Sequence, residues 1–143
     1  MHIINIYLEY GYIDMEGIIK EPDLPFMFLW GGRGTGKTYG ALKYAEKNYK
    51  ITGERFIYLR RTDKQLDECM RADNNPFKQL NIDREWSIYP AKHKDYGRAY
   101  FNCNITDNGK LEINSEPHGY MLSLSTIGNI RGLSYSDVSL IIY

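Results

Sequence analysis

Eight residues near position 35 form a pattern that binds phosphate. The spacing Gly31-x-x-x-x-Gly36-Lys37-Thr38 matches the phosphate-binding loop in full. Glycines let the backbone curl so that successive N–H groups point at one phosphate, and the helix that follows adds its positive end. In such a loop Lys37 reaches the β- and γ-phosphate oxygens, and the Thr38 hydroxyl binds Mg²⁺. The sequence therefore predicts a site for ATP and Mg²⁺ formed by Gly31, Gly32, Arg33, Gly34, Thr35, Gly36, Lys37 and Thr38.

Arg33 lies inside this loop and places a fixed positive charge close to the γ-phosphate. There it could stabilise transition-state charge in cis, as an arginine finger does. It could equally bind phosphate in the ground state or pair with a neighbouring acid, and placement by sequence does not separate these roles. Lys37 and Arg33 are therefore the candidate catalytic residues. A glycine-rich turn without a ligand is the alternative, which the length of the match disfavours.

The elements that must position the loop are predicted from the apolar pattern on each side of it. The run Phe26–Trp30 has the length and bulk of a buried strand. A helix is predicted to begin at Lys37 and to end at Gly53, with one apolar face made of Ala41, Leu42, Ala45 and Tyr49. The order strand, glycine loop, helix is the context that the motif needs.

Strands and helices continue to alternate after this helix. Residues 56–59 form a second strand, and Thr62 with Gln65 resembles the capping box of a short helix. Residues 71–85 are predicted as a loop with a helical turn, and residues 120–125 and 138–143 as strands. The alternating segment 99–105, the turn Asp107-Asn108-Gly109 and apolar positions 111 and 113 predict a β-hairpin.

The expected fold is an α/β P-loop NTPase of the ASCE type, in which an extra strand separates the loop strand from the acid-bearing strand. We expect a mostly parallel sheet flanked by helices, with the β-hairpin as an insertion. Residues 1–24 are predicted to be an N-terminal arm, irregular or with a short strand. Residues 25–143 are predicted to be the P-loop ATPase domain.

Hydrolysis by a P-loop also needs acidic residues. P-loop NTPases place an Asp at the tip of an apolar strand to hold Mg²⁺, often followed by a Glu that polarises water. The strand 138–143 resembles that strand, but no Asp-Glu pair follows it, Asp107 lies in a turn and Asp137 lies at the wrong end. We therefore expect a domain cut short before its Walker B acids, or a strand with another role. Alone, the chain is expected to bind nucleotide weakly and to hydrolyse it poorly.

The composition is that of an ordinary globular domain. The chain has 143 residues, 18 basic and 18 acidic, so its formal net charge is zero. This balance excludes a protein that holds nucleic acid by bulk positive charge, but it allows a local basic patch. The longest apolar runs, Phe26–Trp30 and Leu140–Tyr143, fall short of the roughly 20 residues that span a bilayer. No signal peptide is visible. We expect an intracellular protein with no membrane partner.

Other polar residues are interpreted as structural. The densest basic cluster, 92–94 with Arg98, could contact phosphates, but Asp95 lies within it and a solvated loop is favoured. His118 has no partner at the spacing of a metal site or a catalytic triad. Cys69 and Cys103 lack the spacing of a zinc site and are expected to be small buried hydrophobes.

The ordered set of motifs resembles the ATPase subunits of tailed-phage DNA-packaging motors, of the large-terminase type. The short phi29-like packaging ATPases are especially similar. The resemblance covers roughly residues 26–143. It rests on the loop and Tyr39, the strand Arg55–Arg61, the hairpin at 100–113, the segments 122–125 and 131–135, and the final apolar strand.

The resemblance implies a ring of subunits that hydrolyses ATP to drive double-stranded DNA through a portal into a procapsid. Its members act in the host cytoplasm. It implies that Lys37 and Thr38 bind triphosphate and Mg²⁺ and that Arg33 supplies the charge in cis. Two other classes remain open. One is a helicase-like or AAA-type cellular ATPase, and the other is a non-catalytic nucleotide-binding module.

Overall fold

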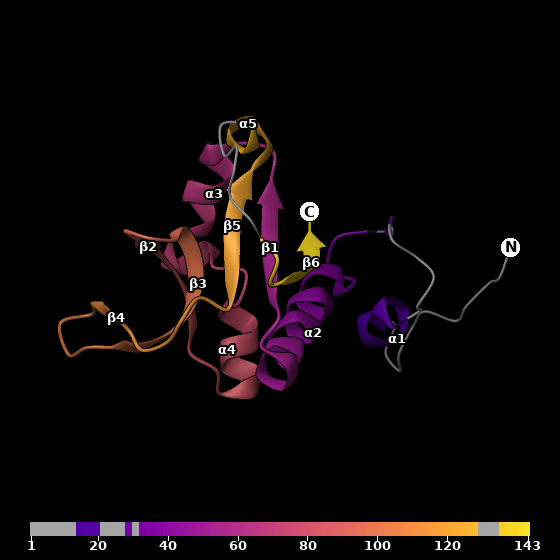
Figure 1. The fold of residues 1–143 in the computed structure, drawn as a ribbon. Helices are drawn as coiled ribbons and strands as arrows, with labels where there is room; N and C mark the ends of the chain where they lie inside the picture. The colour runs from indigo at the N-terminus through magenta and orange to yellow at the C-terminus, as the bar shows by residue number, and fades with distance from the viewer. Residues whose placement is uncertain (1–13, 21–27, 30–31, 129–134) are drawn as a thin grey trace, which may run out of the picture.

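The computed structural model describes residues 14–20, 28–29, 32–128 and 135–143, whose arrangement is shown in Figure 1. In chain order the elements are α1 (Met15–Ile19), α2 (Lys37–Thr52), β1 (Arg55–Arg60), α3 (Asp63–Cys69), the 3₁₀ turn η2 (Ala72–Asn74), α4 (Lys78–Arg84), β2 (Ile88–His93), β3 (Gly97–Ile105), β4 (Leu111–Ile113), β5 (Gly119–Ser123), α5 (Leu124–Ile127) and β6 (Val138–Ile142). Over these residues the protein is a mixed α/β fold built on a six-stranded sheet. Among these residues no helix is long and apolar enough to cross a membrane.

The helix after the glycine loop forms as its apolar pattern predicts. α2 buries Ala41, Leu42 and Ala45 along one face. Gly36 precedes it with φ 80° and Gly53 follows it with φ 76°, a conformation that is costly for a residue with a Cβ. Both ends of α2 are therefore set by glycines, and the predicted helix is confirmed.

The prediction of a mostly parallel sheet is wrong, because the sheet is mixed. Its strand order is β2-β3-β5-β1-β6, with β4 paired to β3. β1 pairs in parallel with both β5 and β6. β3 is antiparallel to β2, β4 and β5. The reason is connection length, since strands joined by a short turn must run antiparallel and parallel neighbours need a longer crossover.

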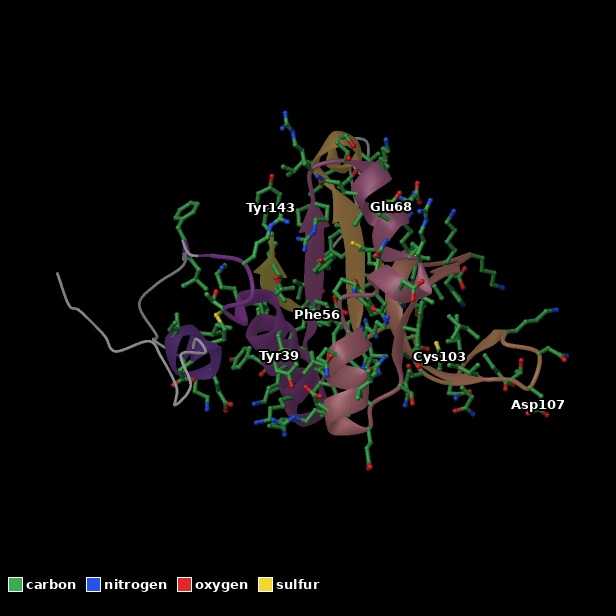
Figure 2. All side chains as sticks on the ribbon, turned by 180° about the vertical axis from the view of Figure 1, so that it is seen from behind. Tyr39, Phe56, Glu68, Cys103, Asp107 and Tyr143 are labelled. Carbon is green, nitrogen blue, oxygen red and sulfur yellow. The ribbon has the colours of Figure 1, made fainter. Side chains whose placement is uncertain are left out.

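Two β-hairpins meet in β3. The predicted hairpin is confirmed, with Ile105 opposite Leu111 and Gly109 at φ 73° in the turn. Figure 1 shows β4 extending away from the rest of the sheet, and Figure 2 shows Asp107 at the tip of this hairpin. The second hairpin, β2–β3, was not predicted. Its first strand contains Pro90, which lacks an N–H donor and is tolerated because β2 lies at the edge of the sheet.

The described helices that cover the sheet pack on one of its faces. A core cluster joins this face to α2, α3 and α4, and its buried members are Leu42, Ala45, Phe56, Tyr58, Leu66, Phe77, Leu80, Ile88, Tyr100 and Met121. Figure 2 shows Phe56 in the middle of the molecule. The cluster on the opposite face is built from strand residues, with Tyr135 packed against it. The helix-covered face is therefore the one that carries the loop and α2.

Several segments differ from their predicted structure. Residues 71–85 contain the full helix α4 in addition to a turn, and the predicted strand 120–125 changes to helix α5 at Leu124. Met15–Ile19 is helical and packs against α2, which the arm prediction for 1–24 did not anticipate. Phe28 and Leu29 are not in a strand, and the rest of the predicted strand at 26–30 lies outside the described residues.

The two cysteines are expected to react at different rates. Cys103 is 1% exposed, and burial raises the pKa of its thiol to about 11, so at pH 8 only about one molecule in a thousand carries the thiolate. Cys69 is half-buried at the end of α3. Iodoacetamide at pH 8 should therefore modify Cys69 first in the native protein. Mass spectrometry of the peptides checks this, and equal labelling of both thiols before denaturation would contradict it.

Candidate phosphate-binding site

The glycine loop curls around a hollow at the N-terminal end of α2. Residues 32–39 line this hollow, whose volume is about 380 Å³. Gly34 and Gly36 both have φ 80°, in the left-handed region where a side chain would be strained. These glycines permit the curl. The predicted residues from Gly32 to Thr38 thus lie together around one hollow, whereas Gly31 lies outside the described part of the chain.

The first turn of α2 offers backbone donors to this hollow. The N–H of Gly40 donates to the carbonyl of Gly36 at 2.8 Å, and no side chain caps the helix. The N–H groups of Thr38 and Tyr39 therefore have no acceptor within the helix. Together with the positive end of the helix dipole, they form a site suited to an anion.

Lys37 folds back across the loop toward the hollow. Its Nζ donates to the carbonyl of Gly32 at 2.6 Å and to Oγ1 of Thr35 at 2.9 Å. These bonds hold a cation at the mouth of the anion site, in reach of an incoming phosphate. The side chains of Arg33 and Thr38 belong to exposed residues that line the same hollow.

The loop lies at the carboxyl edge of the parallel strands. Ile142, near the end of β6, packs against the apolar cluster that contains Ala41. At the other end of the strand, Nδ2 of Asn48 donates to Oγ of Ser139 at 3.2 Å. α2 therefore runs antiparallel to β6, and its N-terminus reaches the edge where β6 ends (Figure 1). In α/β sheets this edge is where ligands bind.

Comparison with protein families gives one match that covers most of the chain. Residues 17–143 match the family described as Podovirus DNA encapsidation protein (Gp16). The chain belongs to this family. It is accordingly a phage DNA-packaging protein with a role in DNA encapsidation. No curated protein and no solved structure matches it.

In this encapsidation protein, the two acidic residues weighed as Mg²⁺ ligands, Asp107 and Asp137, lie away from the glycine loop. Asp137 precedes β6 and pairs with Arg55, and it also accepts from the hydroxyl of Tyr120 at 3.3 Å. Asp107 lies at the tip of the β3–β4 hairpin (Figure 2). Among the described residues, no group of three or more His, Cys, Asp or Glu could hold a metal ion. The structure therefore brings together only the glycine-loop residues of the predicted site.

The basic cluster lies in the β2–β3 hairpin, with Lys94 in its exposed turn and Lys92 and Arg98 in its strands. Lys92 lies opposite Arg98 in the register of the two strands. Arg98 pairs with Asp63 at 3.0 Å and with Asp67 at 2.8 Å. Acidic residues of α3 therefore neutralise Arg98 within this cluster.

His118 has a structural partner that its sequence neighbours did not reveal. Its Nδ1 lies 2.8 Å from Oε2 of Glu46, whose side chain is fully buried in α2. The imidazole stacks on Tyr49 with 4.0 Å between ring centroids. These contacts connect α2 to the segment before β5. They agree with the interpretation of His118 as a structural residue.

For Arg60 and Arg61, which end the second predicted strand, the family resemblance suggests a role in nucleotide coupling or DNA grip, and surface charge is the alternative for at least one of them. Arg60 and Arg61 are adjacent arginines after an apolar strand, and their types alone do not distinguish them. The structure makes Arg61 exposed and Arg60 half-buried. Tyr58 lies two residues earlier on the same face of the strand, and the guanidinium carbon of Arg60 lies 3.8 Å from the centroid of its ring.

Proposed function

We propose that the protein binds ATP with Mg²⁺ at residues 31–38 and is an ATPase that drives double-stranded DNA into the procapsid. The observation that supports this most is the geometry of the loop. Its hollow faces the uncapped N-terminus of α2, at the carboxyl edge of the sheet, with the ammonium of Lys37 across its mouth. Moving DNA into a procapsid requires energy, and ATP bound at this site supplies it.

The residues present fit a Mg²⁺-triphosphate. Lys37 carries three N–H donors, two of which already hold loop oxygens and can be exchanged for phosphate oxygens. The hydroxyl of Thr38 is available as an oxygen ligand at the first turn of α2, and hard cations such as Mg²⁺ prefer oxygen ligands. Bound Mg²⁺ neutralises charge on the phosphates. Arg33, exposed in the loop, adds a positive charge either to the bound state or to the transition state.

The proposed partners follow from this activity and from the family. The protein acts on double-stranded DNA, assembles with other copies of itself in a ring, and works at the procapsid portal in the host cytoplasm. A net charge of zero is compatible with a protein that releases DNA after each step. The P-loop ATPase of the ASCE type is the proposed fold family.

The experiment that tests this function measures ATP turnover by the packaging protein with and without duplex DNA and procapsids. We expect ATP turnover to need Mg²⁺ and to rise several-fold when both DNA and procapsids are present. Binding of ATP without any stimulation of turnover would favour a nucleotide-binding module instead. Stimulation by DNA alone, with procapsids inert, would favour a helicase-like ATPase.

A further inference from the structure

Three groups of the glycine loop are joined by hydrogen bonds in a triangle. The hydroxyl of Thr35 donates to the carbonyl of Gly32 at 3.2 Å. The ammonium of Lys37 donates to the same carbonyl at 2.6 Å and to the Thr35 hydroxyl at 2.9 Å. All three residues line the hollow of about 380 Å³. Without nucleotide, the cation that would bind phosphate is therefore bound to the loop itself.

The position of Thr35 in the loop explains how one hydroxyl reaches both partners. Gly34 and Gly36 flank it, and both have φ 80°. These two positive φ values turn the backbone sharply on either side of Thr35. Threonine hydroxyls readily bond to nearby backbone groups, and here the acceptor is the carbonyl of Gly32, three residues earlier. The hydroxyl oxygen remains available as an acceptor for Lys37, two residues later.

The contact between Thr35 and Lys37 affects the free energy of nucleotide binding. A hydrogen bond with a charged partner is stronger than one between neutral groups. When the N–H donors of Lys37 turn to phosphate oxygens, the bond to the Thr35 hydroxyl is lost. That loss subtracts from the binding free energy, because the bond is made only in the nucleotide-free loop.

We propose that Thr35 restrains Lys37 in the nucleotide-free loop and thereby lowers the affinity of the site for nucleotide. This inference rests on the proposed function and adds a means of regulating the same site. An incoming phosphate must separate the ammonium from the hydroxyl. When ADP leaves, the contact forms again and favours its departure, and product release is the step that limits turnover in many enzymes.

The test removes the hydroxyl and measures affinity for Mg²⁺-ADP and Mg²⁺-ATPγS by calorimetric titration of the chain. Thr35→Val lacks the hydroxyl but keeps the branched shape of threonine. It should bind both nucleotides about threefold to tenfold more tightly than the wild type, since it no longer holds the ammonium away from phosphate. Thr35→Ser restores a hydroxyl and should bring both affinities back toward the wild-type values.

A double-mutant cycle shows whether the hydroxyl acts through Lys37. In the Lys37→Ala background there is no ammonium for Thr35 to hold. Adding Thr35→Val to Lys37→Ala should therefore change the affinity for either nucleotide by less than about twofold, because coupled residues are non-additive. A role of Thr35 in loop shape alone would give the same effect in both backgrounds.

Three outcomes would overturn the inference. Thr35→Val could bind both nucleotides as the wild type does, or it could bind them more weakly, which would make the hydroxyl a ligand of the nucleotide. It could also tighten binding equally with and without Lys37. A wild-type chain that binds neither nucleotide would instead contradict the proposed function. Should Thr35→Val not fold by circular dichroism, Thr35→Ala removes the same hydroxyl and has to show the same tightening.

Discussion

The Lys37→Ala variant is expected to bind Mg²⁺-ATP about 100-fold more weakly than the wild-type chain. Lys37 is the ammonium across the mouth of the hollow, at 2.6 Å from the Gly32 carbonyl. Its loss removes two charge-assisted hydrogen bonds to phosphate, each worth about 1.5 kcal/mol or more, and about 3 kcal/mol corresponds to this factor. Calorimetric titration measures the effect. In the packaging protein, DNA-stimulated turnover should fall with it.

A matched control separates this effect from a general loss of positive charge. Lys64 is an exposed lysine on α3, away from the hollow, and Lys64→Ala should bind ATP as the wild type does. Circular dichroism checks that α2 is intact in both variants. Affinity of Lys37→Ala within about threefold of wild type would show that the hollow is not the nucleotide site.

Gly119→Ala is expected to destabilise the fold by about 2 to 3 kcal/mol. A Cβ on Gly119 would lie 2.5 Å from ring atoms of Phe56, which is too close for any pair of carbons. The Phe56 ring cannot move away easily, because it is 1% exposed and lies between Phe77 at 6.1 Å and Tyr100 at 5.9 Å. Overpacking of such a core forces shifts in backbone and side chains. Urea denaturation, read as a lower midpoint at an unchanged slope, measures the loss.

Gly128 provides the control for this substitution. It ends α5 with φ −65°, and a Cβ there meets no heavy atom within 4 Å. Gly128→Ala should leave stability unchanged or raise it by less than about 1 kcal/mol, since alanine narrows the unfolded ensemble. Equal stability of Gly119→Ala and Gly128→Ala would show that Phe56 does not pack over β5 as described.

The features predicted correctly from sequence are the ones that neighbouring residues determine. The loop glycines, the helix from Lys37 and the turn at Gly109 each depend on φ values and apolar spacing within one short segment. Likewise, Thr62 caps α3 by accepting from the N–H of Gln65 at 3.4 Å, as the capping box predicts. Local chemistry was enough because every group involved lies within a few residues of its partner.

The order of the strands was not predicted, because it depends on pairings between distant segments. The sequence shows alternating strands and helices, which favours a parallel sheet, but not that β3 lies between β2 and β5. Pro90 and the charged residues that follow it made β2 hard to recognise as a strand. The edge of a sheet tolerates both. The buried bond from His118 to Glu46 spans 72 residues, and no local pattern reveals it. The contact between the Arg60 guanidinium and the Tyr58 ring is likewise visible only in the folded structure.

The position of β1 between β5 and β6 has a consequence for how the chain folds. Hairpins such as β2–β3 join residues that are near each other in sequence, and they form within microseconds. β1 must instead recruit distant strands, since Phe56 pairs with Gly119 and with Leu140, 63 and 84 residues further on. Such high contact order slows folding, because the loop-closure entropy is lost before the pairing is gained. We therefore expect the antiparallel part of the sheet to form early, and the parallel pairs of β1 with β5 and β6 to be completed last.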